Sequence, residues 1–197
     1  MAKKEPLLRR EKILMSALDA FTEKGIFETT MSDIRRISGA STGSVYHHFN
    51  GKQHIAFELY LHGIQEFYNI GLEVIRTNPE AKEGITTIIR RALLWHDENR
   101  SLGFFLFRAA DTGFLDEHNE TIRASQVDFL KEFATWMEPR MESGEIRRIP
   151  HRLQVPLIVG PTREFLRNWM PECRKELLAQ ALEYLPQAAW EVIAGDK

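Results

Sequence analysis

Apolar residues recur at helical spacing along nearly the whole 197-residue chain, and this periodicity limits the possible folds more than any other feature. Near the N-terminus, Ile13, Leu18 and Phe21 fall on one face of a helix. Gly25 then ends the pattern, as glycine commonly does after a last helical turn. No sustained alternation of β-branched residues and no hairpin turn between strand-like runs occurs elsewhere. The sequence therefore predicts an all-α fold.

Capping and breaking residues divide the chain into helices with short connections. Thr30-Met31-Ser32-Asp33 has the hydroxyl and the acid of a capping box, which predicts a helix start at this point. Asn78-Pro79 ends a long helix, and Met170-Pro171 separates the last two. We expect Pro156, Pro161 and Pro186 to disturb the helices that contain them. The predicted helices cover about 8–24, Thr30 to Gly39, 42–48, 52–76, 80–99, 101–110, 117–141, 151–169 and 173–193.

The composition is that of an ordinary globular protein, with 43% hydrophobic and 27% charged residues. No apolar run reaches the length of a membrane span, and the first residues lack the apolar core of a signal peptide. Cys173 is the single cysteine, which excludes an internal disulfide and a zinc site built from cysteines alone. We expect a cytoplasmic protein with no membrane partner, no metal and no cofactor.

The charge is unevenly distributed along the chain. The net charge is −2, but residues 1–52 hold nine Lys and Arg against six Asp and Glu, so this segment carries +3 and the remainder −5. A basic N-terminal segment on an acidic body suits a protein that approaches DNA by one end.

The segment from Thr30 to Phe49 predicts a helix-turn-helix. Two short helices flank a tight turn at Gly39-Ala40-Ser41, where glycine accepts backbone angles that side chains resist. In this motif the second helix lies in the major groove of DNA and the first crosses the backbone. The residues expected to form its small core are Ile34, Ile37, Val45 and Phe49, packed against Leu14, Leu18 and Phe21.

The side chains left exposed by this motif suit DNA better than catalysis. Small hydroxyl residues at the start of the second helix let the backbone approach phosphate, and Tyr46 and His47 can reach phosphate or base edges. Lys52 can bind a further phosphate, and the Arg35-Arg36 pair adds positive charge. The residues expected to contact DNA are Thr30, Arg35, Ser41, Thr42, Gly43, Ser44, Tyr46, His47 and Lys52.

Residues 8–60 resemble the DNA-binding region of TetR-family regulators. Arg35 departs from the family, which usually has Ala there, and Ala40 stands where Val is usual, which puts base preference and local packing in question. The resemblance implies a homodimer that binds a palindromic operator and is released or altered by a small ligand in each body. The matching positions are Thr29-Thr30, Ile34, Ser38-Gly39-Ala40-Ser41, Gly43, Val45-Tyr46, His48-Phe49 and Lys52.

Residues 52–197 are expected to form a helical bundle that binds a ligand and dimerises, with residues 1–51 as the DNA-binding domain. The helix over 117–141 has two apolar stripes, one through Val127 and Leu130, which predicts burial on two sides. The last two helices are rich in apolar residues, and this surplus surface predicts a homodimer through them.

Aromatic residues of the body are candidates for lining an effector cavity, although ordinary core residues would look the same. Arg108 follows an apolar run, and a buried arginine there would need a partner, such as Asp111, a ligand carboxylate or an acid on another helix. The candidate ligand-binding residues are Trp95, Phe104, Phe107, Arg108, Trp136, Arg163 and Asn168.

The function predicted is therefore that of a sequence-specific transcriptional regulator, a repressor rather than an enzyme. Two alternatives stay open: a helical ligand-binding or protein-interaction module without operator binding, and a helical-bundle enzyme. A metal site also stays possible, because residues that can bind metals recur every four positions at His54, Glu58, His62 and Glu66. Against an enzyme, the sequence has no Gly-rich phosphate loop, nucleophile elbow or Cys/His pair, and we expect no catalytic residues.

Overall fold

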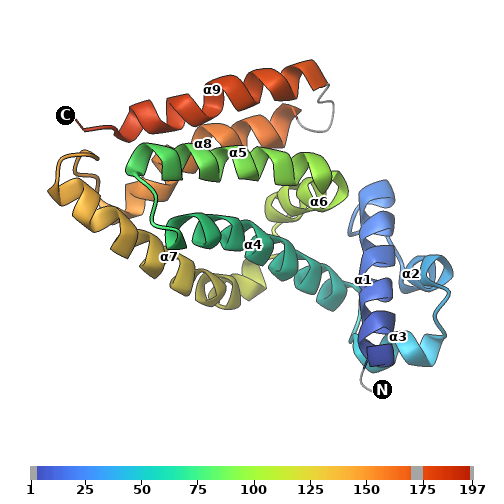
Figure 1. The fold of residues 1–197 in the computed structure, drawn as a ribbon. Helices are drawn as coiled ribbons and strands as arrows, with labels where there is room; N and C mark the ends of the chain where they lie inside the picture. The colour runs from blue at the N-terminus through green and yellow to red at the C-terminus, as the bar shows by residue number, and fades with distance from the viewer. Residues whose placement is uncertain (1–3, 170–174, 196–197) are drawn as a thin grey trace. The chain divides into compact units, whose positions relative to one another are not determined.

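The computed structural model describes residues 4–169 and 175–195, and their regular elements are helices joined by short connections (Figure 1). The all-α prediction is confirmed. The helices are α1 (Lys4–Lys24), α2 (Met31–Ser38), α3 (Thr42–His48), α4 (Lys52–Arg76), α5 (Ala81–Glu98), α6 (Arg100–Asp111), the short 3₁₀ helix η1 (Asp116–His118), α7 (Asn119–Glu142), α8 (His151–Trp169) and α9 (Lys175–Ile193).

Most helix ends fall where the sequence supplies a stop. Gly25 has φ +87° and donates its amide hydrogen to the Phe21 carbonyl, and Gly39 ends α2 with φ +67°. The predicted ends agree within two or three residues, except that α1 begins at Lys4. The predicted break at Met170-Pro171, residue Cys173 and the predicted start of the last helix lie outside the described residues.

The prolines in the last two helices do not end them. Helix α8 continues through Pro156 and Pro161, and α9 continues through Pro186. Each proline removes one backbone donor, and packing of α9 against α5 and α8 supports these helices in addition to their own hydrogen bonds. The expected disturbance therefore does not amount to a break.

The chain divides into two compact units, of which the first holds Met1–Ile64 and Ser101–Asn119. Helix α1 packs against α2 and α3, and the side chains of Ile34, Val45 and Phe49 are at most 2% exposed. Leu18 and Phe21 complete this core as predicted, whereas two further predicted members are only half-buried. Those two are Leu14 and Ile37.

The second unit holds Gln65–Arg100 and Glu120–Lys197. Helix α9 packs against α5 and α8 (Figure 1). The side chains of Ile85, Ile89 and Ile193 are fully buried in this unit. A single antiparallel bridge between Ile146 and Ala194 joins the connection before α8 to the end of α9. The last helix is thereby held at its end as well as along its length.

Helix α7 is buried on two sides only in part. Trp136 and Met137 are buried, but Val127 is 54% exposed and Leu130 is 45% exposed. The prediction of two-sided burial is therefore wrong at Val127 and Leu130, in the first half of this helix.

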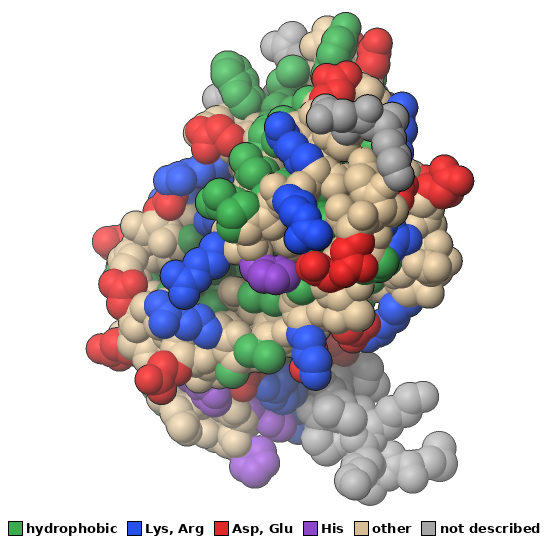
Figure 2. Space-filling model, turned by 90° about the vertical axis from the view of Figure 1, so that its left-hand side faces the viewer, with side chains coloured by type: hydrophobic (Ala, Val, Ile, Leu, Met, Phe, Trp, Pro, Cys, Tyr) green, Lys and Arg blue, Asp and Glu red, His purple; other side chains and the backbone are tan. Residues whose placement is uncertain are grey.

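The boundary between the two compact units falls inside α4, after Ile64. The predicted boundary after residue 51 concerns functional domains and stays a prediction. Among the described helices, none combines the length and the apolar character that crossing a membrane requires. On the face seen in Figure 2, acidic, basic and apolar side chains are interspersed.

Candidate nucleic-acid interface

The first unit contains a helix-turn-helix formed by α2 and α3. The Thr30 hydroxyl accepts a hydrogen bond from the Asp33 amide at 3.1 Å, and the Asp33 carboxylate accepts one from the Thr30 amide at 3.0 Å. This is the predicted capping box, and it fixes the start of α2. The Ser41 hydroxyl caps α3 by accepting from the Ser44 amide at 3.2 Å.

The glycine in the turn is required by the backbone. Gly39 adopts φ +67°, in the left-handed region, and donates its amide hydrogen to the Arg35 carbonyl at 3.0 Å. A side chain in this conformation would be strained, so the residue type follows from the turn. The tight turn sets the angle at which α3 leaves α2.

One face of α3 is buried and the opposite face is exposed. Val45 anchors the helix in the core at 2% exposure, whereas Thr42, Gly43 and His47 are exposed and Tyr46 is 55% exposed. A helix that packs on the core through one face and exposes the opposite face can enter a major groove without losing its core contacts. These four exposed residues are among the predicted DNA contacts, and their contact with DNA stays a prediction.

His48 is half-buried, which agrees with a supporting position rather than a readout position. Burial lowers the pKa of its imidazole, and the charges of His47, Arg10 and Arg9 lower that pKa further. The ring therefore favours its neutral form, beside the buried Phe49 ring at 6.3 Å.

Two predicted DNA-contact residues also have structural partners. The Lys52 ammonium donates to the carbonyl oxygens of Phe27 and Thr29, the latter at 2.8 Å, and so ties the α1–α2 connection to the start of α4. The Thr30 hydroxyl donates to Asp33 at 2.7 Å. An ammonium has three hydrogens, so the two bonds to carbonyl oxygens still allow a bond to phosphate. A phosphate contact from Lys52 stays a prediction.

Asp33 is held in its charged form by its neighbours. A hydrogen bond from the Lys24 ammonium at 2.7 Å, followed by the hydrogen bonds from Thr30, holds the pKa of the Asp33 carboxyl well below its usual range. This carboxylate therefore links the end of α1 to the start of α2.

A basic hollow beside the turn was not predicted from the sequence. It has a volume of about 480 Å³, and its lining includes Arg9 and Lys12 of α1 together with Gly39, Ser41 and Ser44. The available signal was the three-residue spacing of the two cations, which places them on one face of α1. Helix α1 therefore contributes charge to the side of the motif where α3 begins.

The predicted ligand-binding residues are spread over different environments. Trp95 is half-buried and donates its indole N–H to Glu66 at 3.0 Å, and Trp136 is buried. Phe104 and Phe107 are half-buried, whereas Arg163 and Asn168 are exposed. Their contact with a ligand stays a prediction.

The interpretation of Arg108 as a buried arginine is wrong. Its side chain is exposed, with the guanidinium carbon 5.5 Å from the centre of the Phe104 ring. The apolar residues before it bury the other face of α6, including Phe105 and Leu106, so the arginine reaches solvent at the end of the helix.

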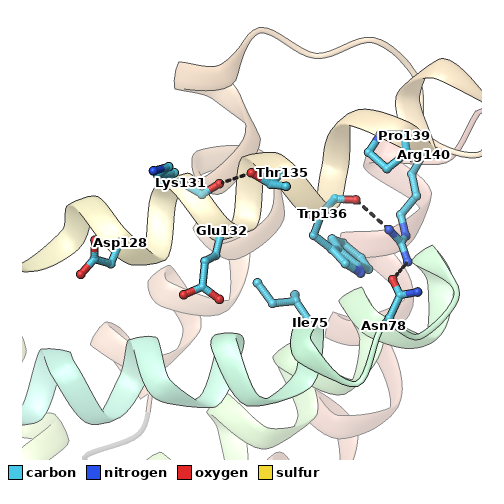
Figure 3. A pocket seen from close by; sticks show the side chains of 9 residues that line it. All are labelled: Ile75, Asn78, Asp128, Lys131, Glu132, Thr135, Trp136, Pro139 and Arg140. Atoms are coloured by element: carbon cyan, nitrogen blue, oxygen red, sulfur yellow. Dashed lines mark hydrogen bonds between the residues drawn. The ribbon is translucent and has the colours of Figure 1, made fainter.

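Of these candidates, Trp136 lines a second hollow of about 480 Å³ between the end of α4 and α7 (Figure 3). The Arg140 guanidinium lies 4.1 Å from the Trp136 ring centre and donates to Asn78 at 2.9 Å. Asp128, Lys131 and other charged groups line the same hollow, so it is not the aromatic cavity predicted.

The described residues contain no group of three or more His, Cys, Asp or Glu side chains arranged to hold a metal ion. His54 instead accepts a hydrogen bond from the Asn50 amide at 3.2 Å and lies 3.1 Å from the Glu58 carboxylate. The four-residue spacing therefore places His54 in contacts that stabilise the start of α4.

Comparison with known proteins places the interface in a family. The profile described as "Bacterial regulatory proteins, tetR family" matches residues 13–59, which span α2, α3 and most of α1. The chain is 24% identical over 139 residues to the HTH-type transcriptional repressor KstR2 of Mycolicibacterium smegmatis. That match covers 65% of this chain and 66% of the repressor, just under two thirds of its length.

Solved structures share the fold over nearly the full length. A TetR family transcription regulator from Marinobacter aquaeolei VT8 has a TM-score of 0.76 at 14% identity, covering 99% of this chain and 100% of that one. The transcriptional regulator FadR from Bacillus subtilis, solved in complex with stearoyl-CoA, has a TM-score of 0.73 at 22% identity, covering 90% and 98%. Residues 13–59 therefore match the DNA-binding domain of the TetR family of transcriptional regulators, and the chain as a whole shares the fold of solved members of that family.

Proposed function

We propose that this protein is a cytoplasmic repressor that binds a palindromic operator as a homodimer and loses DNA affinity when a small molecule binds in its helical body. It acts by binding and has no catalytic role. The exposed face of α3, held from behind by the buried Val45, is the observation that carries the proposal.

The homodimer is supported by the apolar surface of the last two helices. Leu153 and Trp169 on α8 are 49% and 58% exposed, and Tyr184 on α9 is 66% exposed. Large apolar side chains left in water on two adjacent helices favour a self-complementary contact. Two such subunits would place their α3 helices in successive major grooves, about 34–36 Å apart.

The effector is proposed to be an amphipathic molecule with a long apolar part. The aromatic residues of the body suit an apolar ligand, and the FadR neighbour was solved with stearoyl-CoA. Such a ligand would weaken DNA binding if it favours a body conformation in which the two α3 helices no longer match the operator spacing.

Selection from a randomised duplex-DNA library at physiological salt tests operator binding. The proposal predicts recovery of one motif with two inverted half-sites. Recovery of a motif without inverted symmetry would contradict the homodimer, and recovery of no motif by a folded sample would favour the protein-interaction alternative.

Release of the selected duplex tests the effector. Stearoyl-CoA is added to the complex with fluorescent operator, and coenzyme A without an acyl chain serves as the matched control. Release by stearoyl-CoA alone supports an acyl-chain effector; equal anisotropy with both compounds contradicts that class.

A further inference from the structure

The basic hollow beside the turn has no anionic partner of its own. Neither Arg9 nor Lys12 forms an ion pair with any described residue, although nearby Arg10 pairs with Glu58. The two exposed cations of α1 line the same hollow, of about 480 Å³, as Ser41 and Ser44.

We propose that this hollow binds a phosphodiester group of the DNA backbone, so that α1 forms part of the interface beside the helix-turn-helix. The chemistry fits a tetrahedral anion, because guanidinium and ammonium groups supply charge and hydroxyl groups supply further donors. The hollow borders the residues that precede α3, so a phosphate bound there would fix the position of α3 along the duplex. This inference rests on the proposed operator binding.

The salt dependence of binding tests the hollow. The double variant Arg9→Gln, Lys12→Gln is compared with the wild-type protein and with Lys82→Gln, an exposed lysine on α5. Because the proposed homodimer carries two such hollows, the variant loses one phosphate contact per subunit. The slope of log K against log salt should therefore fall by about 1.8 in magnitude, which is about 0.9 for each contact, on operator and on unrelated duplexes alike. Inorganic phosphate, titrated without DNA while the Ser41 and Ser44 amides are followed by NMR, distinguishes capture of the free anion from capture of the backbone.

A double variant with the same slope as Lys82→Gln overturns the proposal while leaving operator binding intact. A wild-type protein with no salt-dependent DNA binding overturns both. Saturation by inorganic phosphate with an unchanged DNA slope would assign the hollow to the free anion and contradict the backbone contact.

A second observation concerns base readout. Arg35 of α2 donates a hydrogen bond from Nη1 to the Thr42 hydroxyl oxygen at 2.7 Å, across the turn. A guanidinium has donors only, so the Thr42 oxygen must accept in this bond and its own hydrogen stays available. No described residue accepts that hydrogen, and Thr42 is exposed at the first position of α3.

We infer that Arg35 fixes Thr42 as a hydrogen-bond donor toward the DNA and thereby determines specificity at one operator position. Guanine, adenine and thymine present an acceptor in the major groove through O6 or N7, N7 and O4, whereas the edge group of cytosine is the N4 donor. The bond from Arg35 occupies one of the two lone pairs of the Thr42 oxygen and leaves its hydrogen free. The hydroxyl therefore favours guanine, adenine or thymine over cytosine at the base that it faces. Because the family usually has Ala at this position, the discrimination would be a property of this chain. It rests on the proposed operator binding.

Library selection with four proteins tests this pairing: Arg35→Ala, Thr42→Val, the double variant, and the matched control Arg36→Ala. Arg36 is exposed on the same helix, and its guanidinium lies 3.8 Å from Asp33. We expect Arg35→Ala and Thr42→Val each to raise the cytosine frequency about tenfold at the same position of each half-site, with no further change in the double variant.

Uniform weakening by Arg35→Ala on all sequences, with the motif unchanged, would mean a phosphate contact and would overturn the inference. Changes at two different positions would also overturn it. If the wild-type protein selects no motif, both the proposed function and this inference are contradicted. If the wild-type protein selects a motif and Arg35→Ala selects the same motif, only this inference is contradicted.

Discussion

At the scale of single residues, the network around Asp33 holds α1 and α2 together. The carboxylate accepts hydrogen bonds from the Lys24 ammonium and from the hydroxyl and amide of Thr30. Removing the Thr30 hydroxyl by Thr30→Ala should lower the free energy of unfolding by about 1 kcal/mol, within a range of about 0.5–2 kcal/mol for a lost N-cap. Urea denaturation followed by circular dichroism measures this, and an unchanged midpoint would contradict it.

The same network predicts an acid-dependent stability. Because the pKa of Asp33 is lower in the folded protein than in the unfolded chain, its contribution is present above the unfolded pKa of about 4 and is lost as pH falls toward the folded pKa. Asp33→Asn should therefore be less stable than wild type at pH 7, and the two should converge at low pH. Denaturation at a series of pH values checks this against Asp19→Asn on α1; a constant gap down to pH 2 would exclude the mechanism.

His96 predicts a second pH effect at higher pH. Burial on α5 lowers the pKa of this imidazole to about 4, so the folded protein does not take up the proton that the unfolded chain binds below about 6.5. Stability should therefore fall as pH decreases from about 6.5 to 4 and then level off for this group. His96→Leu should remove that part of the dependence, and an unaltered profile between pH 6.5 and 4 would contradict it.

At the scale of elements, periodicity and caps predicted the helices well because both signals are local. Thr30, Gly39 and Ser41 act within a few residues, and their structures match the sequence prediction. Lys52 and Arg35 differ: Lys52 bonds carbonyl oxygens 23 and 25 residues away, and Arg35 reaches across the turn. No spacing rule specifies such partners, because the turn and the packing on α1 determine which groups meet.

Local sequence signals also could not predict which helix faces are exposed to solvent. Arg108 follows four apolar residues, yet the face of α6 on which it lies is exposed. The stripe through Val127 and Leu130 has the same cause, since periodicity identifies an apolar face without identifying what covers it.

Helices α8 and α9 give the element-scale prediction. If their exposed apolar side chains form the dimer contact, Leu153→Glu and Tyr184→Glu should each shift the protein toward monomers, because a charge would be desolvated in the contact. Val127→Glu, also on an exposed apolar position, is the control and should leave the mass unchanged. Sedimentation velocity at several concentrations measures the result, and dimers that resist both α8–α9 variants would place the contact elsewhere.

At the scale of the whole molecule, regulation requires coupling between the body and the interface. If stearoyl-CoA weakens operator binding by a given factor, operator must weaken stearoyl-CoA binding by the same factor, typically between about 5 and 150. Titration calorimetry with and without the selected duplex measures both halves of this cycle. A ligand affinity unaffected by DNA, together with ligand-induced release, would violate this reciprocity and would point to loss of folded protein rather than to coupling between two sites.

The most direct test of the central claim, that the exposed face of α3 reads the operator, is library selection with His47→Ala beside wild type. His47 is exposed on this face, so its removal leaves the core and both caps in place. We predict a motif altered at the same position in both half-sites, whereas Val127→Ser in the body should retain the wild-type motif. An unaltered motif for His47→Ala, Tyr46→Phe and Thr42→Val alike would contradict readout by α3.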